Sequence, residues 1–82
     1  MNKPSKEQLA SQIKLIQIVK EDSKIKVVLG ADNPQDLLSE ETAQFAKDKA
    51  ELKFNRPFHM AAVSDVTVRG QNELAYREYY FI

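Results

Sequence analysis

The chain has 82 residues, and its twelve Lys and Arg residues balance twelve Asp and Glu residues to a net charge of zero. This length predicts one domain of modest stability, and the neutral balance removes the overall positive field that draws a domain to nucleic acid or to an anionic membrane. Because the sequence contains no Cys, disulfides, thiolate chemistry and Cys-ligated zinc are excluded.

No segment has the composition of a targeting or membrane segment. The N-terminus lacks the apolar run of about 7–15 residues that a signal peptide needs. No stretch approaches the roughly 20 apolar residues of a membrane span. We therefore expect a soluble cytoplasmic protein that forms a single domain over residues 1–82.

A short helix is predicted at the start of the chain, over residues 6 to about 11. Ser5 and Gln8 have the spacing of a capping box, which is typical of a helix start. Apolar residues continue at helical spacing beyond it, so residues 12–20 are open to a helical or a strand interpretation.

A β-hairpin is the favoured interpretation of the next segment. Residues 13–19 and 24–29 are rich in β-branched side chains and flank the polar pair Asp22 and Ser23. Gly30 is expected to end the second strand.

The hydrophobic pattern also predicts the register of this hairpin. A turn at the polar pair sets Ile18 opposite Val27, and it sets Ile16 opposite Leu29. One face of the hairpin is then apolar.

The middle of the chain predicts one amphipathic helix. Asn33 and Pro34 form one helix start, and Ser39 forms a second. The segment is therefore either one helix from Pro34 or a short turn over residues 34–38 followed by a main helix at Glu40–Phe54. On a helical wheel the apolar arc contains Thr42, Ala43, Phe45, Ala46, Ala50 and Leu52.

Lys49 falls inside this apolar arc. Its alkyl stem can pack while the ammonium extends to water. The alternative is that the ammonium reaches an anionic ligand or a protein partner.

Two further strands are predicted at residues 58–69 and 73–82, with a turn at residues 70–72. Their alternation favours an alignment that pairs Val68 with Leu74, Val66 with Tyr76, Ala62 with Tyr80 and Asp65 with Arg77.

These elements predict an α+β fold, a four-stranded antiparallel sheet in ββαββ order with the main helix packed on one face. The strand order and the covered face stay open. If the helix covers the Val66 side, then Val63, Tyr79 and Phe81 lie on the reverse face, where they are either exposed or covered by a partner.

The sequence contains no recognisable catalytic or metal-binding pattern. His59 is the only His, Ser64 and Asp65 alternate in face along a strand, and the two glycines fall at turns rather than in a phosphate loop. We expect no enzyme activity, no cofactor, no metal and no small-molecule substrate.

The aromatic C-terminus is the candidate contact with another protein chain. Amphipathic rings are enriched at the centres of interfaces, and one helix cannot bury both faces of this strand. The candidate partner-binding residues are Val63, Tyr76, Tyr79, Tyr80 and Phe81.

Basic residues of the first hairpin offer a different function. Lysines beside aromatic rings on a sheet can bind single-stranded nucleic acid by phosphate contacts and stacking. The candidate contacts for nucleic acid or another anion are Lys14, Lys20, Lys24, Lys26, Lys49, Arg56 and Arg69.

A resemblance to a known class rests on residues 45–80. It is carried by Phe45, Ala46, Lys49 and Ala50 in the helix, Phe58, His59 and Val63 in the next strand, and Leu74, Ala75 and Tyr76 after the turn. This pattern resembles small phage-type accessory proteins of the anti-CRISPR class. The resemblance implies a protein that binds and blocks or distorts a larger complex, with no catalysis and no cofactor, and it assigns no functional residue.

We therefore expect a small non-catalytic protein-binding module, of which an inhibitor that binds and blocks a larger complex is one form. One alternative is a small nucleic-acid-binding domain that uses the hairpin lysines. The other is a structural subunit that forms a homodimer.

Overall fold

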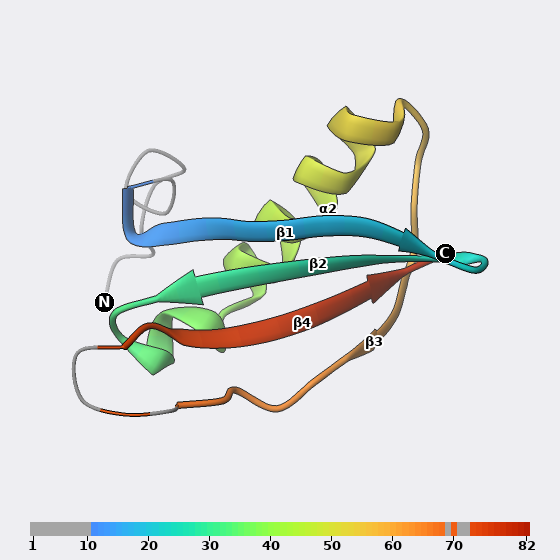
Figure 1. Cartoon of the computed structure of the whole chain (residues 1–82). Coiled ribbons are helices and arrows are strands. Elements are labelled where there is room, and N and C mark those ends of the chain that lie inside the picture. Colours follow the sequence, from blue (N-terminus) through green and yellow to red (C-terminus); the bar gives the residue numbers. More distant parts are fainter. Residues whose placement is uncertain (1–10, 69, 71–72) are drawn as a thin grey trace.

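The computed structural model describes residues 11–68, 70 and 73–82 and shows a four-stranded antiparallel sheet with one α-helix on one face (Figure 1). The predicted fold class is confirmed. The helix predicted over residues 6 to about 11 lies almost entirely outside the described residues. The elements are β1 Ile13–Glu21, β2 Lys24–Ala31, the 3-10 helix η1 Pro34–Leu37, α2 Glu40–Phe54, β3 Met60–Val63 and β4 Ala75–Phe81.

The strand order is β1-β2-β4-β3, so the two hairpins meet through their second strands. Burial explains this order. β2 is buried at six of its eight positions, from Val27 to Ala31 and at Ile25, whereas all four residues of β3 are exposed. A short, exposed strand belongs at an edge, where it leaves few backbone groups unpaired.

The first hairpin follows the predicted register only near its turn. Ile18 pairs with Val27 as predicted, and Asp22 takes the positive φ of 54° that the tight turn requires. The prediction for Ile16 is wrong, because a β-bulge shifts the register and brings Leu15 opposite Leu29. A bulge inserts one extra residue and reverses the face alternation beyond it.

Gly30 does not end β2 but lies inside it, opposite Lys14 of β1 and Tyr76 of β4. A Cβ atom built on Gly30 would lie 2.7 Å from Cδ1 of Ile16. The bulged Ile16 therefore packs directly over the glycine, and the absence of a side chain there accommodates it.

Both predicted helix starts are confirmed. The Asn33 side chain accepts a hydrogen bond from the Gln35 backbone N–H at 3.0 Å, and Pro34 begins η1. Ser39 caps α2 by accepting from the Thr42 backbone N–H at 3.2 Å. Each cap satisfies a backbone donor that the first helical turn leaves free.

The core lies between α2 and the sheet. From α2 it takes the small residues Ala46 and Ala50, together with Thr42, and their size lets the helix approach the strands closely. Leu52 was predicted to face the core, but 79% of it is exposed. The buried cluster contains Ile13, Ile25, Val27, Leu29, Ala31, Leu37, Ala46, Ala50, Phe58, Ala75, Tyr79 and Phe81.

The second hairpin is shorter and less regular than predicted. Ala62 pairs with Tyr80 as expected, but β3 ends at Val63 and a register shift between Met60 and Ala62 breaks its alternation. Beyond the strand the alignment moves by one residue, so Thr67 rather than Val66 pairs with Tyr76. The predicted pairing of Val66 with Tyr76 is therefore wrong.

Arg77 was predicted to pair with Asp65, but its guanidinium donates its hydrogen bonds to backbone carbonyls. Its Nε donates to the Ser64 carbonyl at 2.7 Å, and its Nη1 donates to the Leu37 carbonyl at 2.8 Å. The Tyr79 hydroxyl donates to the same Leu37 oxygen at 3.1 Å. Burial raises the pKa of the Tyr79 hydroxyl, and the charge and hydrogen bonding of Arg77 partly offset that rise.

The shared Leu37 acceptor predicts unequal and coupled losses of stability. Tyr79→Phe removes one donor from an oxygen that Arg77 still serves, so we expect the free energy of unfolding to fall by about 1 kcal/mol. Arg77→Met removes the donors of two carbonyls, so we expect a fall of about 2–3 kcal/mol. The double variant leaves Leu37 without either donor and should lose more than the sum.

Urea denaturation measures these differences. Arg56→Met is the control, because the exposed Arg56 guanidinium only stacks on the Phe58 ring at 4.3 Å and should change stability by no more than about 0.5 kcal/mol. Equal losses in the two single variants, or a strictly additive double variant, would contradict the shared acceptor.

Candidate functional site

The candidate functional site is the sheet face opposite α2, which we call the open face. None of the described helices lies on it, since α2 and η1 both pack on the other side. Strand alternation assigns its side chains, because residues paired across strands share a face. From the centre outward these residues are Val28, Lys26 and Lys24 of β2, Tyr76, Glu78 and Tyr80 of β4, Lys14, Ile16, Gln17, Val19 and Glu21 of β1, and Ala62 of β3.

The open face combines an apolar base with two tyrosine rings. Val28 lies at its centre and is 8% exposed, and Val19 is half-buried beside it. Tyr76 and Tyr80 are also half-buried and stand two positions either side of Glu78 along β4. Rings of this kind offer apolar area and a hydroxyl group on one side chain.

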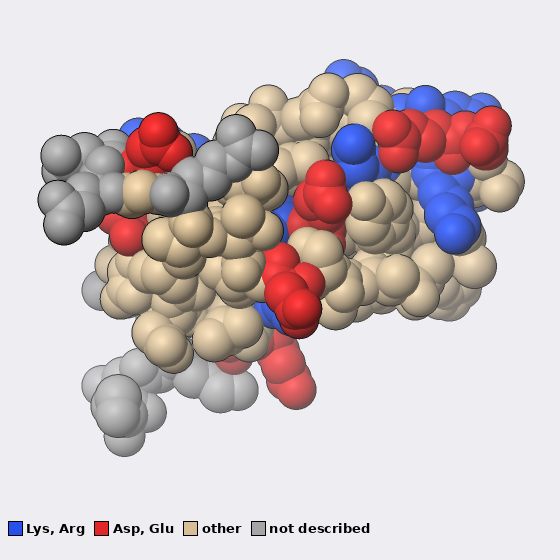
Figure 2. All heavy atoms as spheres, turned by 60° about the horizontal axis from the view of Figure 1, so that its bottom comes forward, with Lys and Arg blue, Asp and Glu red and all other residues tan. Residues whose placement is uncertain are grey.

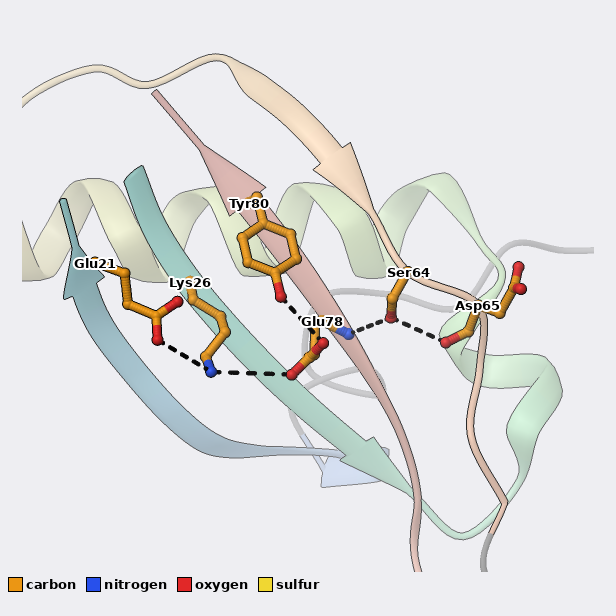
Figure 3. Close-up of polar contacts among 6 residues, drawn as sticks. All are labelled: Glu21, Lys26, Ser64, Asp65, Glu78 and Tyr80. Atoms are coloured by element: carbon orange, nitrogen blue, oxygen red, sulfur yellow. Dashed lines mark hydrogen bonds and ion pairs between the residues drawn. The ribbon is translucent and has the colours of Figure 1, made fainter. Parts of the chain in front are cut away.

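A line of polar contacts crosses the open face from β1 to the segment after β3 (Figure 3). The Lys26 ammonium lies 3.4 Å from a Glu21 carboxylate oxygen and 4.0 Å from a Glu78 carboxylate oxygen. The Tyr80 hydroxyl donates to the other Glu78 oxygen at 3.1 Å. Glu78 in turn donates its backbone N–H to the Ser64 hydroxyl at 2.9 Å. These contacts hold three charges and one ring in a fixed arrangement.

The charges along this line of contacts alter the pKa of the Tyr80 hydroxyl. Partial removal from water, the hydrogen bond to Glu78 and the negative charge of Glu78 raise the pKa of the Tyr80 hydroxyl, while Lys26 lowers it. Tyr80 is therefore held protonated as a hydrogen-bond donor on the open face.

A hollow lies at one end of the open face, beside the first turn. It has a volume of about 460 Å³ and is lined by Glu21, Asp22, Ser23, Lys24, Ala62 and Tyr80. Its lining combines charged side chains with the Tyr80 ring.

The structure separates the five predicted partner-binding residues. Tyr76 and Tyr80 lie on the open face, but Tyr79 and Phe81 are fully buried against α2, so the prediction that they contact a partner is wrong. Val63 is 41% exposed on the edge strand β3 opposite Tyr79, and so it lies away from the open face. Alternation along β4 is the physical reason, because it buries one pair of rings and presents the other.

The predicted basic contacts do not form one surface. Lys14, Lys24 and Lys26 lie on the open face, but Lys20 pairs with Ile25 on the opposite face. Acidic side chains lie among the basic ones on the side of the molecule drawn in Figure 2.

The remaining basic candidates lie around α2 or outside the described residues. The Lys49 ammonium lies 5.2 Å from the Phe45 ring centre and Arg56 stacks on the Phe58 ring, so both are engaged by aromatic rings of this chain. Arg69 lies outside the described residues.

Sequence reasoning missed the role of Glu78. Glu78 is absent from the candidate residues that the sequence suggested, yet it joins Lys26, Tyr80 and Ser64. Its position two residues before Tyr80 was the available signal, because residues i and i+2 of a strand share a face.

The described residues contain no group of three or more His, Cys, Asp or Glu side chains that could hold a metal ion. His59 is exposed and joins the chain end through its backbone, which exchanges two hydrogen bonds with Ile82 at 2.8 Å. Among the described helices none is both long and apolar enough to cross a membrane.

No protein-family model, curated protein or solved structure matches this chain. The geometry of the open face is therefore the basis for a functional proposal.

The Tyr80 contacts predict a shifted titration that two variants move in opposite directions. Glu78→Gln removes the negative charge, so we expect the Tyr80 pKa to fall toward its ordinary value of about 10. Lys26→Gln removes the positive charge that lowers this pKa, so we expect it to rise further. NMR of the Tyr ring carbons against pH measures both.

The sign for stability follows from the raised pKa. The folded state holds the phenolic proton more tightly than the unfolded state, so this contribution is present below pH 10 and is lost as the pH rises through the folded pKa. Asp48→Asn on α2 is the control and should leave the Tyr80 pKa unchanged. A Tyr80 pKa that Glu78→Gln does not alter would contradict the assigned cause.

Proposed function

We propose that this protein is a non-catalytic binding module whose open face docks on a protein partner. The observation that supports the proposal is the division of β4, which buries Tyr79 and Phe81 under α2 and presents Tyr76 and Tyr80 on the open face. Exposed contiguous aromatic and apolar surface is typical of interaction sites. A protein that binds and blocks a larger complex is one form of such a module.

The charges of the open face favour a protein as the partner. Lys26 stands between Glu21 and Glu78, so this part of the face has both signs and little net field. A polyanion needs a surface of one sign, whereas a protein surface offers both signs together with apolar groups. The Tyr80 ring supplies the apolar centre that a protein interface requires, and Ile16, which is 52% exposed, adds apolar area on β1.

Site-specific photocrosslinking tests this proposal. A benzophenone amino acid in place of Tyr80 should form an adduct with a protein partner in an extract of the source cells. The same probe at Leu38, which is 54% exposed on the linker between η1 and α2, is the matched control and should form none. Excess unmodified protein should suppress the adduct, whereas excess Tyr80→Asp protein should not, because a carboxylate in the apolar centre opposes docking.

Three results would overturn the proposed partner. They are equal labelling from Tyr80 and Leu38, equal competition by the Tyr80→Asp protein, and the absence of any adduct from Tyr80. An adduct of twice the chain mass would assign the open face to self-association instead.

A second candidate function is the binding of single-stranded nucleic acid. The observation that favours it is that Lys14, Lys24 and Lys26 share the open face with Tyr76 and Tyr80. Stacking on the rings and phosphate contacts from the lysines would together supply the affinity.

Fluorescence anisotropy with a short labelled oligonucleotide separates the two candidates. Because Glu21 and Glu78 flank Lys26, we expect no binding at moderate salt. Binding that weakens as salt rises would favour the second candidate if Lys24→Glu with Lys26→Glu abolishes it. Lys47→Glu with Lys53→Glu on α2 is the matched control, and an equal effect of both double variants would exclude the open face as the site.

A further inference from the structure

The outer edge of β1 is a second surface, distinct from the open face. β1 is the longest described strand, with nine residues, and no described strand lies on its outer side. Every second residue of an edge strand directs its backbone N–H and C=O groups away from its neighbour, so such an edge is a template for another strand. The other edge, β3, has only four residues.

Apolar side chains accompany this edge on the α2 side. Leu15 is 44% exposed and Leu52 is 79% exposed, and both line a groove between β1 and α2 of about 400 Å³. Lys49 and Lys53 of α2 also line this groove. Figure 1 shows the C-terminal end of α2 reaching past β1. A strand placed against β1 would therefore lie under the exposed part of the helix.

We propose that the outer edge of β1 pairs antiparallel with β1 of a second copy of this chain. This proposal concerns a surface other than the open face and does not depend on the proposed protein partner. A second copy fits because one two-fold arrangement satisfies the backbone, the apolar side chains and the charges together.

The bulge at Ile16 selects the register of this pairing. It places Ile13, Leu15, Ile18 and Lys20 on the α2 face and Lys14, Ile16, Gln17, Val19 and Glu21 on the open face. When two such strands pair, residues opposite each other must lie on the same side of the joined sheet. This holds along the whole length of the strands only when the two bulges meet at the two-fold axis. Ile16 then lies opposite Gln17 of the second copy.

The remaining pairs in that register are favourable. Leu15 lies opposite Ile18 of the second copy, twice by symmetry, and Leu52 stands beside this apolar pair. Lys14 lies opposite Val19 of the second copy and diagonal to its Glu21. Both charged side chains lie on the open face, and a lysine is long enough to reach the diagonal carboxylate. No two like charges stand directly opposite, since Lys20 faces Ile13.

This dimer has a structural consequence. The two sheets become one, both α2 helices lie on the same side, and the two open faces join into a single surface. Pairing of one strand edge with a few apolar contacts buries less than a standard interface, so we expect an affinity that requires a concentration series to measure.

Sedimentation velocity over a concentration series tests the dimer on the full chain. We expect a monomer–dimer equilibrium, and we expect Leu15→Lys to raise the dissociation constant by about tenfold or more, since each copy brings its new charge toward the other. Leu52→Lys should weaken the dimer in the same direction without a risk to folding, because that side chain is almost fully exposed.

Val63→Lys is the matched control for Leu15→Lys, because Val63 on the opposite edge strand is 41% exposed against 44% for Leu15. This variant should leave the dissociation constant unchanged. A monomer at every concentration would overturn the proposal. The proposal would also be overturned if Val63→Lys weakened the dimer and Leu52→Lys left it unchanged.

Disulfide crosslinking tests the register, and the chain has no Cys to interfere. A mixture of Lys14→Cys and Val19→Cys proteins should form a mixed disulfide under mild oxidation. A mixture of Lys14→Cys and Lys20→Cys proteins should not, because those positions lie on opposite faces. Equal yields from the two mixtures would overturn the register and with it the role of the bulge.

Discussion

The carbonyl oxygen of Leu37 is the point on which the two halves of this fold depend. It accepts hydrogen bonds from Arg77 and from the buried Tyr79 hydroxyl, both of which belong to the last strand. Leu37 ends the short helix that follows the first hairpin, so these bonds join the chain before α2 to the chain after it. Arg77 also holds the Ser64 carbonyl, which fixes the segment beyond β3. A buried acceptor without donors is costly, so the arrangement specifies one packing of the two hairpins.

This junction also determines which face of the sheet is open. Tyr79 and Arg77 must point toward η1 to reach Leu37, and alternation then directs Tyr76, Glu78 and Tyr80 to the other side. The lysine and the two carboxylates that accompany Tyr80 follow from the same constraint, because cross-strand pairs share a face. The direction in which the β4 side chains point therefore determines both the packing of the core and the composition of the open face.

The sequence predicted the elements of this fold well and its registers incompletely. The helix starts at Pro34 and Glu40 are local, since the caps at Asn33 and Ser39 contact residues only two or three positions away. The hairpin turn is also local. The bulge at Ile16 depends on Gly30 in the next strand, and the choice between Tyr79 and Tyr80 for the core depends on Leu37. These contacts join residues distant in sequence, so a periodicity argument cannot find them.

The bulge has a further meaning for the exposed edge of β1. A bulge usually protects an edge strand, because it interrupts the alternation that an incoming strand must match. For a second copy with the same bulge the interruption can cancel, since both strands change face at the same place. An arbitrary strand lacks that matching change and would bring apolar and charged side chains to the wrong faces. The bulge that opposes nonspecific pairing of β1 therefore favours pairing with β1 of a second copy, in the single register that aligns Ile16 with Gln17.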